Sequence, residues 1–233
     1  LNPANADVAP KNVTYQALTT DFAVDGASVS LHLSGRHNLE NGLASLAVCR
    51  ALGVNMKAAA GSLSAVMAVP GRLERVDIGQ SWTVVIDYAY EPEALARCIE
   101  ALKFMPHRRL IHVLGSCGGG RDHARRPLLG AFAAKHADIA IITNEDPYDD
   151  DPASIIQEIA DGAIKEGKQL GDDLLMIQDR QEAITMAMRL AQPGDLVLLT
   201  GKGCEPWICV AHGEKLAWDE RAAAEQGIRE AMK

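Results

Sequence analysis

Four short segments of this chain are rich in glycine, polar and charged side chains, and each follows an apolar run. They are Asp87 to Glu93, Gly115 to Asp122, Thr143 to Asp151, and Thr200 to Glu205. In a parallel sheet, the segments that follow the carboxyl ends of the strands meet at one edge, where ligands bind. We therefore expect the four segments to form one shared binding site, and their convergence is a stronger signal than any one of them.

Within these segments, a few side chains have chemistry that suits a charged ligand. Arg121 follows three glycines and carries a planar donor fork that suits a carboxylate or a phosphate, although a flexible turn with an exposed arginine would have the same sequence. Glu145 and Asp146 come soon after their apolar run and are candidates to meet an ammonium group. Residues 149–151 precede a predicted helix, and there we expect acidic side chains to satisfy free N–H groups.

Two glycine-rich stretches look like nucleotide motifs and fail as such. The run from Gly115 lacks the second glycine of a dinucleotide fingerprint, because position 117 is a cysteine. Lys202 lies between two glycines, whereas a P-loop lysine is followed by Ser or Thr. A nicotinamide dehydrogenase is therefore disfavoured. An ATP-driven reaction cannot be complete within these residues unless it uses an unusual phosphate site.

Cysteine and histidine give no metal signature. The five cysteines form no Cys-x-x-Cys pair, and the seven histidines show no metal-ligand spacing. No metal site is predicted, and free thiols favour a reducing cytoplasm. Cys117 and Cys204 are on loops that could face each other, but two uninvolved thiols are the simpler interpretation. His37 and His123 lie on plausible site loops.

The elements that would position these loops follow from the hydrophobic pattern. After the breaker at Val69-Pro70-Gly71, short apolar runs alternate with amphipathic stretches, which predicts βαβ units and a mainly parallel, Rossmann-like α/β sheet. Before it, the pattern predicts a hairpin over 20–33 and helices over 38–52 and 56–68. Later strands are predicted at 82–86, 110–114, 139–142, 174–177 and 196–199, helices at 92–104, 124–136, 152–165, 180–191 and 218–231, and a late hairpin over 210–216.

Composition limits the possible partners. The chain has 233 residues, is 48% hydrophobic and 23% charged, and carries a net charge of −8. Residues 1–69 carry four basic and four acidic side chains, so the acidic excess lies entirely in residues 70–233. This balance argues against nucleic acid as a partner, and no apolar run is long enough to predict a membrane span. An acidic surface is expected, with attraction of cationic ligands as the alternative.

Several motifs together resemble the Mur ligase family. They are Gly35 to Ala44, Pro70 to Glu74, Asp87-Tyr88-Ala89, Gly118 to Asp122, Arg126-Pro127-Leu128, Gly201-Lys202-Gly203 and Glu205. The order and spacing are most similar to the branch that adds the third amino acid to UDP-N-acetylmuramoyl-L-alanyl-D-glutamate. The resemblance implies that residues 1–69 are the end of the central, ATP-binding domain and that residues 70–233 are the C-terminal domain. The first domain, the P-loop and most of the magnesium site would then lie upstream of Leu1.

The resemblance also implies roles for individual residues. The positions that match nucleotide-binding residues of the family are Asn38, Asn41, Arg72, Asp87 and Tyr90. Those that match the pocket for the incoming amino acid are Arg121, Glu145, Asp146, Tyr148, Gly201 and Glu205. Arg121 could bind an α-carboxylate, and Glu205 could receive an ammonium group. The implied reaction is ATP- and Mg²⁺-dependent amide formation on a UDP-linked muramoyl dipeptide, and no catalytic residue is assigned.

The sequence departs from the family pattern in three places. Tyr90-Glu91 stands where the family usually has His-Thr, and Cys204 stands where it usually has His. Tyr148 stands where diaminopimelate-adding members have an arginine for the second carboxylate. With Glu145 and Asp146 beside it, this change favours lysine or a similar cationic side chain over diaminopimelate. A non-catalytic binding module, and an archaeal or cyanophycin-type ligase with another acceptor, remain as alternatives.

Overall fold

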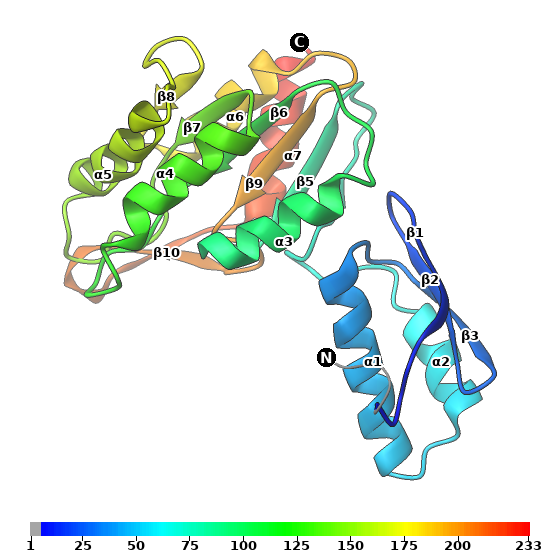
Figure 1. Cartoon of the computed structure of the whole chain (residues 1–233). Coiled ribbons are helices and arrows are strands. Elements are labelled where there is room, and N and C mark those ends of the chain that lie inside the picture. Colours follow the sequence, from blue (N-terminus) through cyan, green and yellow to red (C-terminus); the bar gives the residue numbers. More distant parts are fainter. Residues whose placement is uncertain (1–5) are drawn as a thin grey trace. The chain divides into compact units, whose positions relative to one another are not determined.

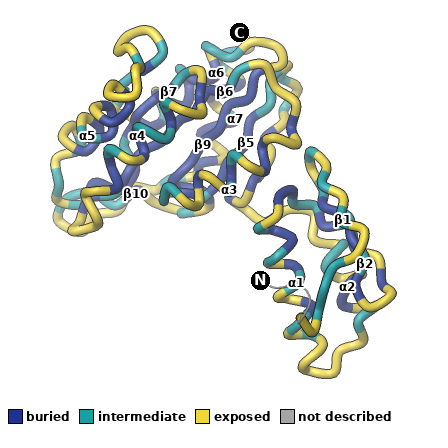
Figure 2. Tube along the Cα trace, in the orientation of Figure 1, coloured by how far each residue is buried: buried dark blue, intermediate teal, exposed yellow. Residues whose placement is uncertain are grey.

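The computed structural model describes residues 6–233, so the first five residues of the predicted 1–69 domain lie outside it. The chain divides into two compact units. One comprises residues 1–69 with 97–106, and the other comprises residues 70–96 with 107–233. Figure 1 shows both units, and Figure 2 shows that each has its own buried interior.

The first unit packs two helices, α1 (Arg36–Ala51) and α2 (Met56–Ser64), with a small antiparallel sheet. The sheet has the order β1 (Lys11–Tyr15), β2 (Thr20–Val24) and β3 (Ala27–Leu31). The turn between β2 and β3 places Asp25 and Gly26 at positive φ, as a two-residue hairpin requires. The predicted hairpin is therefore present. Helix α2 ends at Ser64 instead of residue 68, and β1 was not predicted.

The second unit is built on a six-stranded sheet in the order β4-β5-β9-β6-β7-β8. All neighbours are parallel except β4 and β5. The strands are β4 (Glu74–Val76), β5 (Thr83–Asp87), β6 (Leu110–Leu114), β7 (Ile139–Ile142), β8 (Leu174–Met176) and β9 (Leu196–Thr200). The mainly parallel α/β sheet is therefore confirmed.

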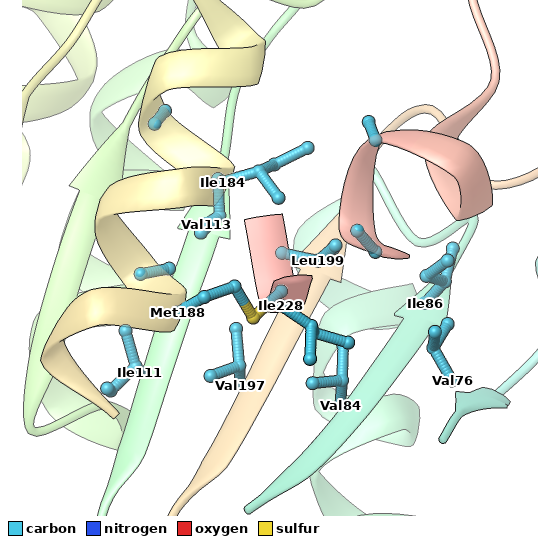
Figure 3. Close-up of a cluster of buried hydrophobic side chains, with 14 of the residues drawn as sticks. Val76, Val84, Ile86, Ile111, Val113, Ile184, Met188, Val197, Leu199 and Ile228 are labelled. Atoms are coloured by element: carbon cyan, nitrogen blue, oxygen red, sulfur yellow. The ribbon is translucent and has the colours of Figure 1, made fainter. Parts of the chain in front are cut away.

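Helices cover both faces of this sheet (Figure 1). Those on one face are α6 (Arg180–Leu190) and α7 (Glu220–Ala231), and those on the other include α4 (Arg125–His136) and α5 (Pro152–Lys165). Helix α3 (Pro92–Leu102) begins in the second unit and continues into the first from Arg97 onward. Figure 3 shows the core under α6 and α7, where Met188 and Ile228 meet Val197 at the sheet. These helices begin and end within about two residues of their predicted bounds. No helix of residues 6–233 is both long enough and apolar enough to cross a membrane.

The late hairpin is also present, and it spans residues 207–217 instead of the predicted 210–216. Strands β10 (Trp207–Cys209) and β11 (Lys215–Ala217) pair antiparallel around the short 3₁₀ helix η2 (Ala211–Gly213). The carboxyl ends of β5, β6, β7 and β9 meet at one edge of the large sheet, because these strands are parallel neighbours. The four segments singled out by composition follow these four strand ends.

Candidate functional site

A pocket of about 160 Å³ lies at this edge of the sheet. All six residues predicted for the amino-acid pocket line it, together with Tyr90 from the predicted nucleotide set. The lining residues are Tyr88, Tyr90, Glu91, Cys117, Arg121, Arg125, Glu145, Asp146, Tyr148, Gly201 and Glu205. The structure therefore brings these side chains from four separate loops into one place, as parallel strands predict.

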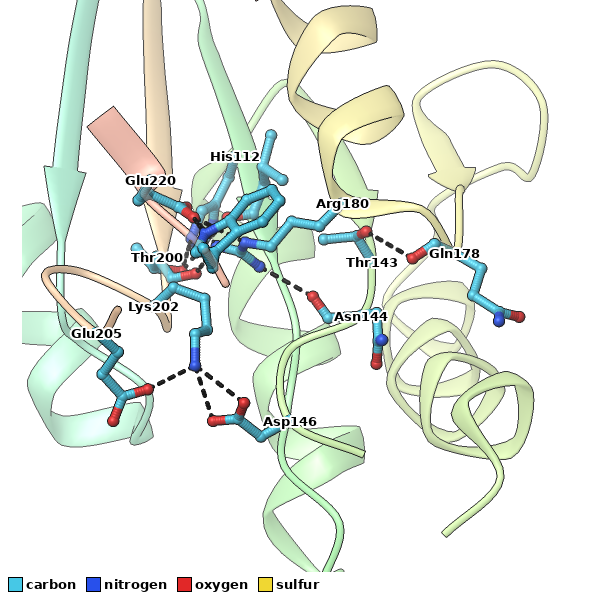
Figure 4. A network of polar contacts seen from close by, with 12 residues as sticks. His112, Thr143, Asn144, Asp146, Gln178, Arg180, Thr200, Lys202, Glu205 and Glu220 are labelled. Atoms are coloured by element: carbon cyan, nitrogen blue, oxygen red, sulfur yellow. Dashed lines mark hydrogen bonds and ion pairs between the residues drawn. The ribbon is translucent and has the colours of Figure 1, made fainter. Parts of the chain in front are cut away.

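Lys202 is the centre of a buried ion-pair network at the base of the site (Figure 4). Its Nζ lies 2.9 Å from both carboxylate oxygens of Asp146 and 2.6 Å from Oε2 of Glu205. Burial alone would lower the pKa of Lys202, but its hydrogen bonds to the two carboxylates raise it. One ammonium group therefore links the loop after β9 to the loop after β7.

The ion pairs occupy two of the carboxylates that sequence reasoning assigned to a ligand. Asp146 is buried and also accepts a hydrogen bond from the backbone N–H of Cys209 at 2.7 Å. The second oxygen of Glu205 accepts the Tyr88 hydroxyl at 2.6 Å. Although burial opposes it, the hydrogen bonds from Lys202 and Tyr88 hold the pKa of Glu205 below its ordinary value. Asp146 and Glu205 are thus already paired with a cation supplied by the chain itself.

Glu145 is in a different situation. It is almost completely buried, its Oε1 accepts the thiol of Cys117 at 3.0 Å, and its Oε2 has no hydrogen-bond partner among the described residues. Burial raises the pKa of Glu145, and burial together with the nearby carboxylate raises the pKa of the Cys117 thiol. Glu145 therefore differs from Asp146 and Glu205, because one of its carboxylate oxygens has no partner among the described residues.

Gly201 is required by its closeness to Glu145. Its φ is +101°, and a Cβ at this position would lie 2.8 Å from the side-chain carboxyl carbon of Glu145. Any larger residue would push that carboxylate out of place. Gly201 thus contributes to the pocket by leaving room for a neighbouring side chain.

Two arginines at the pocket have contrasting roles. Arg121 is exposed, and within residues 6–233 its guanidinium has no side-chain partner. Arg125, which sequence reasoning missed, is buried; it pairs with Glu91 and lies with its guanidinium carbon 5.6 Å from the centre of the Tyr90 ring. Arg121 is therefore the cation that is left to bind an anionic ligand.

Tyr148 lies in the loop after β7 and has an unusual backbone conformation. Its φ is +51°, its backbone N–H donates to the carbonyl of Cys209 at 3.1 Å, and its ring lies over Gly119. A hydrogen bond with the Cys209 side chain raises the pKa of its hydroxyl. The hairpin that carries Cys209 therefore holds both Tyr148 and Asp146.

The predicted nucleotide residues are divided between the two units. Arg72, Asp87 and Tyr90 belong to the second unit, and Asn38 and Asn41 to the first. Arg72 and Tyr90 both contact the ring of Tyr88, and Asp87 immediately precedes Tyr88 in the sequence. The guanidinium carbon of Arg72 is 4.8 Å from the centre of the Tyr88 ring, which meets the Tyr90 ring edge-on at 5.4 Å.

Asp87, Asn38 and Asn41 differ in how accessible they are. Both carboxylate oxygens of Asp87 accept backbone N–H groups, from Leu73 and Ala89, each at 2.9 Å. This carboxylate thus fixes the start of the second unit. Asn38 is buried and donates to the carbonyl of Ser34 at 2.9 Å, whereas Asn41 is exposed.

The remaining acidic residues of the loop after β7 behave only partly as predicted. Asp151 caps helix α5 by accepting from the N–H groups of Ala153 and Ser154. Asp150 instead pairs with Arg126 at 3.1 Å, and Asp149 accepts the N–H of His212. These long-range partners come from segments that a local pattern does not reveal.

Cysteines and histidines form no metal centre within residues 6–233. Cys204 is exposed and lines a second pocket of about 290 Å³, whereas Cys117 lines the first. All five cysteines are free. His123 is exposed near Asp150 and does not line the first pocket.

Comparison with known proteins identifies a family model described as "Mur ligase, glutamate ligase domain", which matches residues 71–203. A UDP-N-acetylmuramyl-tripeptide synthetase of Roseiflexus sp. strain RS-1 is 40% identical over 97% of this chain and 45% of its own length. A UDP-N-acetylmuramoyl-L-alanyl-D-glutamate–2,6-diaminopimelate ligase of Geobacillus kaustophilus is 38% identical over 88% of this chain and 40% of its own length. The chain therefore spans less than half the length of these curated relatives.

Solved structures of Mur ligases are also similar to this chain. The structure of a UDP-N-acetylmuramoyl-L-alanyl-D-glutamate–2,6-diaminopimelate ligase matches 100% of this chain and 47% of its own chain, at 28% sequence identity and a TM-score of 0.64. A UDP-N-acetylmuramate-alanine ligase of Thermotoga maritima has a TM-score of 0.66 over 97% of this chain and 46% of its own, at 14% identity, which shows a common fold.

Proposed function

The chain belongs to the Mur ligase family, and on that premise we propose that it is the amino-acid-binding part of an ATP-dependent ligase of peptidoglycan precursor synthesis. The reaction would join an amino acid to a UDP-linked muramoyl dipeptide. The observation that carries the proposal is the pocket at the sheet edge, where one unpaired guanidinium and one carboxylate with a free oxygen lie on loops of the same cavity. A zwitterionic ligand needs both charges.

In this reaction, ATP would phosphorylate the terminal carboxylate of the dipeptide, and the α-amine of the new amino acid would attack the acyl phosphate. The new C–N bond forms, the C–O bond to phosphate breaks, and phosphate leaves. This chain's residues would orient the attacking amino acid: Arg121 would bind its α-carboxylate and Glu145 a side-chain ammonium group. Holding the two reactants in a fixed geometry accounts for a large part of the rate of such a step.

The described residues do not fit a magnesium site. Mg²⁺ prefers open carboxylate oxygens, but the carboxylates of Asp146 and Glu205 are already held by Lys202, and no group of three possible ligands forms within residues 6–233. We therefore assign no step of the reaction to a metal ion held by this chain. Because these 233 residues contain no P-loop motif, the phosphates of ATP would also be bound elsewhere in the complete ligase.

Arg72 and Tyr88 support a role for the second unit in nucleotide binding. A guanidinium stacked at 4.8 Å on a tyrosine ring presents a flat, cationic surface that suits a phosphate or a purine base. Asp87 would act here by fixing the backbone on which Arg72 and Tyr88 stand. Asn38 and Asn41, in the first unit, stay predicted nucleotide-binding residues.

We propose that the amino acid is a diamino acid and that a lysine-like side chain is preferred to diaminopimelate. The support is the pair Glu145 and Tyr148: Glu145 lines the pocket with a buried carboxylate whose Oε2 has no partner among the described residues, and no arginine stands at position 148. A second carboxylate on the ligand would meet Glu145 and Asp146. The Geobacillus kaustophilus relative is named for diaminopimelate, so the preference must be measured.

The test is turnover by the complete ligase that contains this chain, with lysine, ornithine and diaminopimelate compared at equal concentrations. We expect kcat/KM for lysine to exceed that for diaminopimelate by about tenfold, roughly 1.4 kcal/mol of transition-state binding. The variant Tyr148→Arg should reverse the order. A wild-type preference for diaminopimelate would disprove the lysine proposal and leave the ligase proposal intact.

Arg121→Ala tests the pocket itself. We expect KM for the amino acid to rise about tenfold or more, because a charge-assisted hydrogen bond is lost, while the melting temperature stays unchanged. Arg229→Ala, at an exposed ion pair on α7, is the matched control and should leave both values unchanged. An unchanged KM in Arg121→Ala would show that the amino acid binds elsewhere. Absence of any ATP turnover by the complete protein would favour a non-catalytic binding module.

A further inference from the structure

Beneath the pocket, Arg180 is a fully buried guanidinium that contacts three separate parts of the second unit (Figure 4). It lies at the first position of α6 and forms two hydrogen bonds to the carboxylate of Glu220, at 3.0 and 2.5 Å. Glu220 is itself 2% exposed, and its Oε2 also accepts the indole N–H of Trp218 at 2.6 Å. The ion pair therefore joins the start of α6 to the start of α7.

The remaining donors of Arg180 point to two backbone carbonyls. Nη1 donates to the carbonyl of Asn144 at 3.1 Å, and Nη2 donates to the carbonyl of Thr200 at 2.8 Å. Asn144 immediately precedes Glu145, and Thr200 immediately precedes Gly201. One planar group thus holds the two backbone positions from which these pocket residues enter the site. A guanidinium can do this because its donors are fixed in one plane.

The separation of these two loops is critical for the pocket. A Cβ at Gly201 would collide with the carboxylate of Glu145, so the two residues leave no room for a side chain between them. A small outward shift of either loop would open a gap at this contact and move the free oxygen of Glu145. Arg180 also stands close enough to Glu145 for its positive charge to lower the pKa of that carboxyl, against the effect of burial.

We propose that Arg180, held by Glu220, is a positioning residue that sets where Glu145 and Gly201 stand in the pocket. It does not touch the ligand: it acts through the carbonyls of Asn144 and Thr200. The effect of Arg180 on amino-acid binding rests on the proposed function, whereas its effect on the position of Glu145 does not.

Two variants separate this role from simple stabilisation. In Arg180→Gln/Glu220→Gln both buried charges are removed together, so neither is left unpaired. In Arg180→Lys a buried cation remains, but one ammonium cannot reproduce the planar fork.

Arg189→Gln is the matched control, because Arg189 lies on the same helix and makes only an exposed ion pair with Glu230 at 3.4 Å. The first measurement is kinetic, on the complete ligase. We expect both Arg180 variants to raise KM for the amino acid about tenfold or more while KM for ATP changes less than about twofold, since a misplacement near 1 Å can cost a factor of about 100. The control should match the wild type.

The second measurement needs no activity. In the 233-residue chain labelled with ¹³C at glutamate carboxyl groups, the Glu145 signal is identified by its loss in Glu145→Gln, and its titration midpoint is followed. We expect the midpoint to rise in the double variant, because the positive charge of Arg180, which lowers the pKa of Glu145, is removed. Unchanged KM and unchanged midpoint in a folded Arg180 variant would overturn the proposal. If the double variant does not fold, Arg180→Lys decides. A shifted midpoint with no amino-acid turnover in the wild type would uphold Arg180 as a positioning residue and reject the ligase function.

Discussion

Lys202 Nζ lies 2.9 Å from both carboxylate oxygens of Asp146, although 56 positions separate the two residues in the sequence. The side chain of Lys202 is completely buried, and that of Asp146 is 8% exposed. A buried pair of this kind contributes little net stability compared with an apolar pair, but removal of one partner leaves the other charged and unsolvated. The network therefore makes the loops after β7 and β9 depend on each other.

Lys202→Met should reduce the free energy of unfolding by about 3–5 kcal/mol, because Asp146 would remain buried without its counter-ion. Urea unfolding followed by tryptophan fluorescence measures this directly, since Trp82, Trp207 and Trp218 all lie in the second unit. Lys135→Met is the control: its ion pair with Glu166 is exposed, and its loss should cost less than about 1 kcal/mol. A similar small cost in both variants would show that Lys202 is not a buried structural cation.

Glu145→Gln should change how stability depends on pH. Burial raises the pKa of Glu145 above the ordinary glutamate value of 4.5, so the folded chain keeps a proton that the unfolded chain has already released. The folded state then binds more protons, and the free energy of unfolding falls as pH rises from about 4.5 to the folded-state pKa. The slope within this window is about 1.4 kcal/mol for each step of one in pH.

The variant has no such proton to lose. The free energy of unfolding of the variant, relative to that of the wild type, should therefore increase as pH rises through this window. Above the window, the difference between the two should stay constant. Urea unfolding from pH 4 to pH 8 provides the measurement, and Glu214→Gln at an exposed position provides the control. Parallel curves for Glu145→Gln and wild type would show that Glu145 titrates as an ordinary carboxyl group.

Gly201→Ala and Gly167→Ala form a matched pair. The two glycines have φ values of +101° and +100°, which L side chains rarely adopt, so an alanine is strained at both, by about 1 kcal/mol or more. Nothing lies within 4 Å of a Cβ at Gly167, whereas at Gly201 it would meet the carboxyl carbon of Glu145 at 2.8 Å. The extra loss of stability in Gly201→Ala, together with a higher KM for the amino acid, therefore measures the contact with Glu145.

A double-mutant cycle provides a check on this interpretation. In a Glu145→Ala background the colliding group is absent, so Gly201→Ala should cost only about the same 1 kcal/mol as Gly167→Ala. If the cost of Gly201→Ala is the same with and without the Glu145 carboxylate, then the strain of the backbone explains it and the close contact does not.

Much of the second unit was predictable because its strands are mostly apolar runs. Leu110–Leu114 and Leu196–Thr200 are buried on both faces, and such runs are recognisable without any long-range information. Strand β4 was missed for the opposite reason: it is three residues long and begins Glu74-Arg75, which gives no apolar signal. Its existence depends on antiparallel pairing with β5.

The location of the pocket could be predicted from the sequence, but most of the contacts between its side chains could not. Parallel strands require the loops after them to converge, so the sequence could indicate which side chains line the cavity. It could not show that Lys202 neutralises Asp146 and Glu205, because this depends on distances of a few ångströms between distant segments. For the same reason, the sequence assigns Glu205 to a ligand ammonium, and it shows Cys117 only as a thiol and not as a donor to Glu145.

His112 provides a final prediction, about acid stability. It is completely buried on β6, its Nε2 lies 2.9 Å from the hydroxyl oxygen of Thr200, and its Nδ1 has no hydrogen-bond partner in the described part of the chain. Burial lowers its pKa from 6.5 to about 3. The unfolded chain therefore binds a proton that the folded chain does not, so stability is complete above pH 6.5 and is lost as pH falls towards 3. The loss due to this side chain between pH 8 and pH 5 should be about 2 kcal/mol.

His112→Gln keeps a neutral polar group near Thr200 and removes the titration. It should be less stable than the wild type at pH 8, because the packing is altered, but this difference should shrink by about 2 kcal/mol when urea unfolding is repeated at pH 5. His123→Gln is the control, since His123 is exposed, and its difference from the wild type should stay within about 0.5 kcal/mol across the same range. A constant difference for His112→Gln would mean that the buried ring accepts a proton without disturbing the fold. The junction of β6 and β9 beneath the pocket would then be more open to water than its burial indicates.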